Sequence, residues 1–143
     1  MLVVGIQFVS KSVEQEKDKT MIEYLTTDAA KQQLEWGKTI EVLLYYGKEN
    51  GLNVIRYATL ASNRDGDRIV MSVWECEDVG NLDYIDIYSF PFVEPDNEVL
   101  KFDFEYIDEL FDKVTELGGK LDQFTRQFGL QQVYEDILKT IQK

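Results

Sequence analysis

The side chains of this protein that are able to take part in chemistry are mainly carboxylates and tyrosines, which alternate in Asp83-Tyr84-Ile85-Asp86-Ile87-Tyr88. In a strand, Tyr84, Asp86 and Tyr88 would share one face, because successive side chains point to opposite sides. A pocket among the tyrosines would raise the pKa of Asp86, whose carboxylate would then serve as a general base or bind a cationic ligand. In the structural alternative, Asp86 only covers the exposed face of the strand.

Other catalytic groups are scarce in this sequence. The chain has no histidine and a single cysteine, Cys76, so it offers neither a histidine-dependent nucleophile nor a structural zinc site. Acidic neighbours would raise the pKa of the Cys76 thiol and disfavour a thiolate. Asp65-Gly66-Asp67 lacks the later ligands of a calcium loop, and Glu94, Asp96 and Glu98 fit a hydrated loop. We therefore expect no metal site, no cofactor and no enzyme activity.

The net charge of the chain is concentrated in one stretch. Residues 75–116 hold 14 of the 27 acidic residues but only 2 of the 15 basic residues, Lys101 and Lys113. This stretch therefore carries the whole net charge of −12, and the rest of the chain is neutral. Such an asymmetry favours a positively charged partner and disfavours nucleic acid and anionic membranes as partners.

The densest part of the acidic stretch is predicted to be a helix that begins with Asp103 as its N-cap. One side of this helix is apolar, as expected of a helix that packs on a core. The other side carries an acidic stripe with spacings of three and four residues: Glu105, Asp108, Glu109, Asp112 and Glu116. Like charges one turn apart destabilise an isolated helix, and only the pair Glu109 and Lys113 offsets this repulsion.

The acidic stripe has two interpretations, a solvated helix face without a partner or a surface that docks on a basic protein. We expect docking and an inhibitory role, because complementary charge accelerates association and selects the partner. Immunity proteins and antitoxins that block a nuclease, and mimics of nucleic acid, are proteins of this physical type. One alternative is a small-ligand-binding domain or a carboxylate-based enzyme that uses Asp86 and its neighbouring tyrosines. The other alternative is a structural subunit or homodimer without small-molecule chemistry.

Length and hydrophobic patterning predict the fold class. With 143 residues, 44% of them hydrophobic, the chain fits one domain with one core. Periodicity and turn residues predict strands at 52–61, 68–76 and 83–90, and helices at 27–51, from Asp103 to 117, and over 121–141. A kink at Trp36-Gly37-Lys38 in the first of these helices and an interruption at Gly129 in the last are alternatives. The expected fold is a single α+β domain, an antiparallel sheet of about four strands with helices packed on one face.

The N-terminal residues add a strand over 2–9 and a segment that fits either of two elements. Ser12 and Gln15 resemble a capping box, which favours a helix over 13–26, whereas a strand over 20–26 is the alternative. No apolar run approaches the roughly 20 residues of a membrane-spanning helix, and no secretory leader follows Met1. Together with the single cysteine, these features predict a soluble protein of the reducing cytoplasm.

Overall fold

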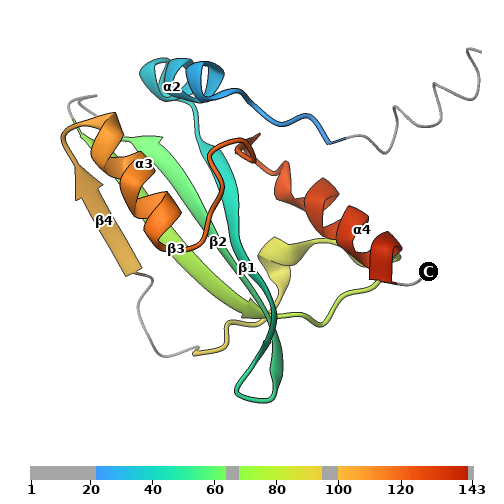
Figure 1. Ribbon diagram of the computed structural model, residues 1–143. Coiled ribbons are helices and arrows are strands. Elements are labelled where there is room, and N and C mark those ends of the chain that lie inside the picture. The colour runs from blue at the N-terminus through green and yellow to red at the C-terminus, as the bar shows by residue number, and fades with distance from the viewer. Residues whose placement is uncertain (1–21, 64–67, 95–99, 142–143) are drawn as a thin grey trace, which may run out of the picture.

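The structure is a computed structural model that describes residues 22–63, 68–94 and 100–141. The elements of the described residues, in chain order, are α2 (Thr27–Glu35), β1 (Ile40–Glu49), β2 (Leu52–Ser62), β3 (Ile69–Glu77), the 3-10 helix η1 (Ile87–Ser89), β4 (Leu100–Phe104), α3 (Ile107–Glu116), β5 (Thr125–Arg126) and α4 (Leu130–Ile141) (Figure 1). The strand expected over 2–9 and residues 13–21 of the helix expected over 13–26 lie outside the described residues. Residues 22–26 form neither that helix nor the alternative strand over 20–26, but only an isolated bridge from Leu25 to Phe124.

The described strands form one antiparallel sheet in the order β4-β3-β2-β1-β5. The long hairpin of β1 and β2 sets the register, from Ile40 opposite Leu60 to Glu49 opposite Leu52. The prediction of an α+β fold with an antiparallel sheet is confirmed, and the described part of the chain has five strands rather than about four. The predicted ends of β2 and β3 agree with the structure to within one residue.

Strand β1 is the largest correction to the predicted fold, because it replaces the second half of the helix expected over 27–51. Helix α2 begins at the predicted place but ends at Glu35. Gly37 follows with φ 78°, a left-handed conformation that suits glycine and turns the chain out of the helix. Asn50 and Gly51, with φ 55° and 84°, then form the two-residue turn of the β1–β2 hairpin.

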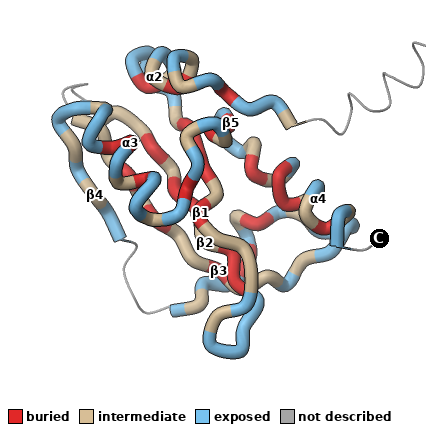
Figure 2. Tube along the Cα trace, in the orientation of Figure 1, coloured by how far each residue is buried: buried red, intermediate tan, exposed pale blue. Residues whose placement is uncertain are grey.

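Two apolar clusters cover opposite faces of the sheet, because successive side chains of a strand point to opposite sides. On one face, Ala58, Leu60 and Met71 pack beneath α2 and α3. On the other face, Ile55 and Tyr57 pack against α4 and η1. Figure 2 shows the buried positions along the strands and on the facing sides of the helices. The expectation that helices pack on one face is therefore wrong: β2 is apolar on both sides, so both sides need a cover.

Two predicted elements after β3 also differ from the structure. Residues 83–90, expected to form a strand, contain a turn and the 3-10 helix η1. The helix expected from Asp103 begins instead at Ile107, because the preceding residues form β4. The alternation of Lys101, Phe102, Asp103 and Phe104 has the period of a strand, and it places Phe102 and Phe104 on the core side of the sheet.

The C-terminal helix is shorter than the predicted helix over 121–141. Thr125 and Arg126 form β5, which pairs with the start of β1, and α4 begins only at Leu130. Phe128, with φ 69°, lies between the two elements in a left-handed conformation that a continuous helix excludes. The sheet therefore gains an edge strand from residues that the apolar periodicity had assigned to a helix.

Candidate functional site

Helix α3 carries most of the carboxylates that were predicted to bind a partner. Asp108, Glu109, Asp112 and Glu116 all belong to this helix, and all four residues are exposed. We call these four residues the acidic face of α3, because their spacing places them on one side of the helix. Glu105, the fifth predicted residue, is also exposed but lies in the bend between β4 and α3.

The orientation of the acidic face is fixed by the buried side of α3. Leu110, Phe111 and Val114 belong to the apolar cluster beneath α2 and α3. The ring centroid of Phe111 lies 5.4 Å from that of Phe124, which precedes β5. Because the helix is packed along its length on this side, its carboxylates project from a fixed surface rather than from a loop.

One cation lies beside the acidic face. Lys113 Nζ is 2.9 Å from Glu116 Oε2 and 4.9 Å from the ring centroid of Phe102. Lys113 was expected to offset Glu109, but the structure pairs it with Glu116 at the other end of the helix. Among the described residues, no ion pair reaches Asp108, Glu109 or Asp112. These carboxylates are free to meet a cation on another molecule.

The residues proposed for a ligand pocket have separate hydrogen-bond partners. Tyr88 donates from its hydroxyl to Glu41 Oε1 at 2.5 Å, beneath the start of α4. Asp86 is exposed beside η1 and accepts a hydrogen bond from Gln131 Nε2 at 3.3 Å. Tyr84 is exposed and bonds within its own loop. No hydrogen bond among the described residues joins Asp86 to either tyrosine.

Glu41 is a buried carboxylate that the sequence analysis missed. Only 2% of this residue is exposed, and it lies in β1 between Thr59 of β2 and Thr125 of the edge strand β5. Its carboxylate accepts hydrogen bonds from the Tyr88 hydroxyl and from the backbone N–H groups of Phe128 and Leu130. Burial raises the pKa of Glu41, and the three hydrogen bonds lower it in part. Glu41 thus caps the start of α4 from a neighbouring strand.

Asp78 makes a second set of hydrogen bonds to α4 further along the helix. Its Oδ2 accepts from the Tyr46 hydroxyl at 2.7 Å, and its Oδ1 accepts from the Tyr134 hydroxyl and from Gly80 N at 3.2 Å. Burial raises the pKa of both tyrosines, and the bonds to Asp78 raise it further. Buried Glu41 and half-buried Asp78 therefore hold α4 against the sheet, which is a structural role.

The described residues hold no group of three or more acidic or cysteine side chains placed to bind a metal ion. Cys76 is buried, and burial raises the pKa of its thiol to about 12, with the negative charges of Asp78 and Glu75 adding to the effect. A thiolate nucleophile at Cys76 is therefore disfavoured at neutral pH.

Comparison of the chain with protein-family models, with curated proteins and with solved structures finds no match. In the part of the chain that the structure describes, no helix is both long enough and apolar enough to cross a membrane. The function is therefore inferred from the geometry of the chain itself.

Proposed function

We propose that this protein is an acidic binding module that docks on a basic surface of another protein through the acidic face of α3. The observation that carries the proposal is the exposure of four carboxylates on one side of a packed helix, three of them without a cation among the described residues. A surface of this kind attracts a basic partner before contact and orients it during approach.

The acidic face also has an internal cost that a basic partner would relieve. Asp112 lies one turn from both Asp108 and Glu116, and each like-charge pair at this spacing destabilises a helix by roughly 0.2 to 0.5 kcal/mol. The four charges extend along roughly 12 Å of the helix, at a rise of about 1.5 Å per residue. Lysine and arginine side chains on a partner would replace this repulsion with attraction.

Strand β4 and the N-cap of α3 carry exposed apolar side chains that are suited to the centre of an interface. Tyr106 is the N-cap residue of α3 and is 64% exposed. Leu100, at the start of β4, is 63% exposed. Buried aromatic anchors ringed by charged residues are the usual energetic centre of protein interfaces. A partner with a basic nucleic-acid-binding cleft fits this arrangement, and occupation of that cleft would inhibit it.

The proposal is tested by reversing the charge of the acidic face. Partners are first captured from the native host with the wild-type protein, and the association rate of each purified basic partner is then measured by surface plasmon resonance. The triple variant Asp108→Lys, Asp112→Lys and Glu116→Lys is expected to associate at least about tenfold more slowly, because electrostatic steering is reversed. Higher salt should slow the wild-type protein but not the variant.

The matched control reverses three exposed acids elsewhere on the surface, Glu35, Asp83 and Asp122, and so changes the net charge by the same amount. This control is expected to keep most of the association rate. Equal rates for the wild-type protein and the α3 variant would reject the acidic face as the interface, as would an equal loss in both triple variants. Far-UV circular dichroism shows whether each variant retains the fold.

A further inference from the structure

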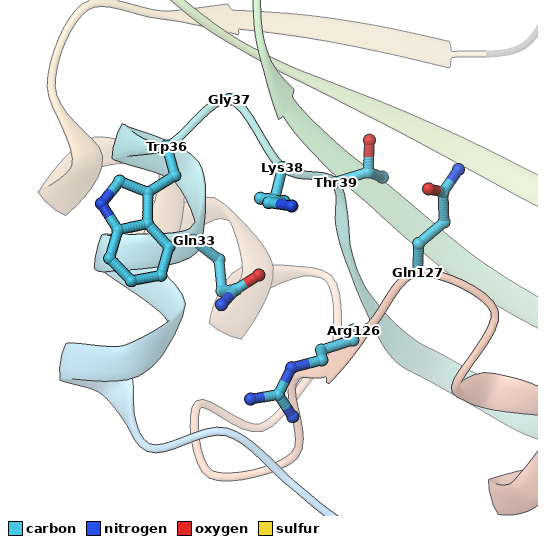
Figure 3. A pocket seen from close by; sticks show the side chains of 7 residues that line it. All are labelled: Gln33, Trp36, Gly37, Lys38, Thr39, Arg126 and Gln127. Atoms are coloured by element: carbon cyan, nitrogen blue, oxygen red, sulfur yellow. The ribbon is translucent and has the colours of Figure 1, made fainter.

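A polar hollow with a volume of about 490 Å³ opens where α2 meets the edge of the sheet. The side chains around it are Gln33, Trp36, Lys38, Thr39, Arg126 and Gln127 (Figure 3). They come from the end of α2, the connection to β1, and β5 with the turn after it. The volume lies within the range of sites that hold small molecules, roughly 300 to 1,000 Å³.

The backbone around the hollow is held by hydrogen bonds and strand pairing. The N–H of Lys38 donates to the carbonyl of Gln33 at 2.9 Å, and the N–H of Trp36 donates to the carbonyl of Gln32 at 3.0 Å. On the opposite side, Arg126 pairs with Ile40 of β1. The carbonyl groups of Gln32 and Gln33, near the end of α2, therefore already have donors.

The charge of the hollow is opposite to that of the protein. Lys38 and Arg126 both line it, and no acidic residue does, although the net charge of the chain is −12. Among the described residues, Arg126 has one ion pair, a 3.4 Å contact with Glu23, whose side chain is 91% exposed. Such an exposed pair contributes little free energy, so an incoming anion displaces Glu23 easily. Lys38 has no ion pair in the described part of the chain.

An aromatic ring also lines the hollow. Trp36 is 61% exposed, an unusual position for the largest apolar side chain. Its indole offers a flat surface on which a planar ring can stack. The amide groups of Gln33 and Gln127 each carry donors and an acceptor, which suits the polar edge of a heterocycle. Two cations match the two negative charges of a phosphate monoester.

We propose that this hollow binds a small molecule that combines a planar heterocycle with a phosphate monoester, the chemistry of a nucleoside monophosphate. Lys38 and Arg126 hold the phosphate, and Trp36 stacks on the heterocycle. The site uses no residue of the acidic face of α3, so it stands independently of the docking function.

The test measures the binding of adenosine monophosphate to the full chain by isothermal titration calorimetry. The double variant Lys38→Gln and Arg126→Gln is expected to lose affinity by at least about tenfold, because it removes both cations. Trp36→Leu should weaken adenosine monophosphate but not inorganic phosphate. The double variant Lys101→Gln and Lys120→Gln makes the same change in net charge away from the hollow and should bind as the wild-type protein does.

Adenosine and inorganic phosphate, titrated separately, show whether both parts of the ligand are recognised. The proposal predicts that each binds at least about tenfold more weakly than adenosine monophosphate. It is overturned if the wild-type protein does not bind adenosine monophosphate, if removal of the two cations has no effect, or if inorganic phosphate binds as tightly as the nucleotide does.

Discussion

Replacement of Glu41 by alanine is expected to destabilise the protein by roughly 4 kcal/mol, a large fraction of the stability of a typical domain. The substitution removes the acceptor of three hydrogen bonds, from the Tyr88 hydroxyl and from the N–H groups of Phe128 and Leu130. Glu41 is only 2% exposed, so the substitution deprives these donors of a buried acceptor. Each unsatisfied buried group costs about 1 to 3 kcal/mol.

Urea unfolding followed by circular dichroism measures this loss. Glu41→Gln is the conservative variant, because its amide oxygen still accepts hydrogen bonds from the backbone of Phe128 and Leu130, and it should cost less than the alanine variant. Glu35→Ala removes an exposed carboxylate from α2, and such surface changes usually stay within about 0.5 kcal/mol. A loss below about 1 kcal/mol for Glu41→Ala would contradict the capping role of this carboxylate.

Glu41 is also expected to make the stability of the folded protein depend on pH, and the direction of its pKa shift sets the sign of that dependence. Burial raises the pKa of Glu41 in the folded protein above its ordinary value of 4.5. The folded state therefore favours the protonated carboxyl group, and the stabilisation from protonation is present below the unfolded pKa. It is lost as the pH rises through the folded pKa. As the pH rises from below 4.5 through the raised pKa of Glu41, the wild-type protein should lose stability relative to Glu41→Gln, measured by urea unfolding at each pH.

The second large effect is expected for Gly80→Ala, at roughly 3 kcal/mol or more. A Cβ atom on Gly80 would lie 2.5 Å from Phe90 Cζ, from the Tyr134 hydroxyl oxygen and from the backbone oxygen of Tyr84. The aromatic rings are packed and the backbone oxygen cannot swing away, so the loop must move as a whole. That movement pulls the Tyr134 hydroxyl away from Asp78 and loosens α4.

Gly51→Ala is the matched control for Gly80→Ala. Gly51 has φ 84°, and nothing lies within 4 Å of a Cβ atom built on it. Its substitution adds only the strain of a left-handed residue, about 1 to 2 kcal/mol. Hydrogen exchange should show faster exchange in α4 for Gly80→Ala and no such change for Gly51→Ala. Equal exchange rates of the α4 amides in the two variants would contradict the expectation that a methyl group on residue 80 displaces its neighbours.

Residue patterns predicted some elements of the fold well and others poorly, for local reasons. β2 and β3 were predicted correctly because apolar and β-branched residues run between clear turn residues. β1 was taken for a helix because Leu43 and Leu44 fit a helical stripe, and the structure has an irregularity in register between Leu43 and Tyr45. The pair Asn50-Gly51 is a strong hairpin signal, and it was interpreted as the end of a helix.

The candidate site was predictable where it depends on local spacing. The acidic face of α3 follows from helical periodicity, which holds although the helix starts at Ile107 rather than Asp103. The role of Glu41 depends on α4, which is distant in sequence. The one local signal was a single acid between Ile40 and Val42 in an apolar run. The hollow beside Trp36 could not be predicted from the sequence, because Lys38 and Arg126 are far apart in the chain. Only the pairing of Arg126 with β1 brings these two cations to the same hollow.

The bonds between Glu41 and the start of α4 have a consequence for the order of folding. The hairpins of β1, β2 and β3 close over short loops, whereas contact between Glu41 and Leu130 closes a loop of about 90 residues, at a higher entropic cost. We therefore expect the three-stranded meander to form first and α4 to dock last. During synthesis, the sheet face that carries Ile55 and Tyr57 is covered only in part, by η1 and Phe90, until α4 has left the ribosome. A chain cut off before Leu130 would expose this face and should aggregate.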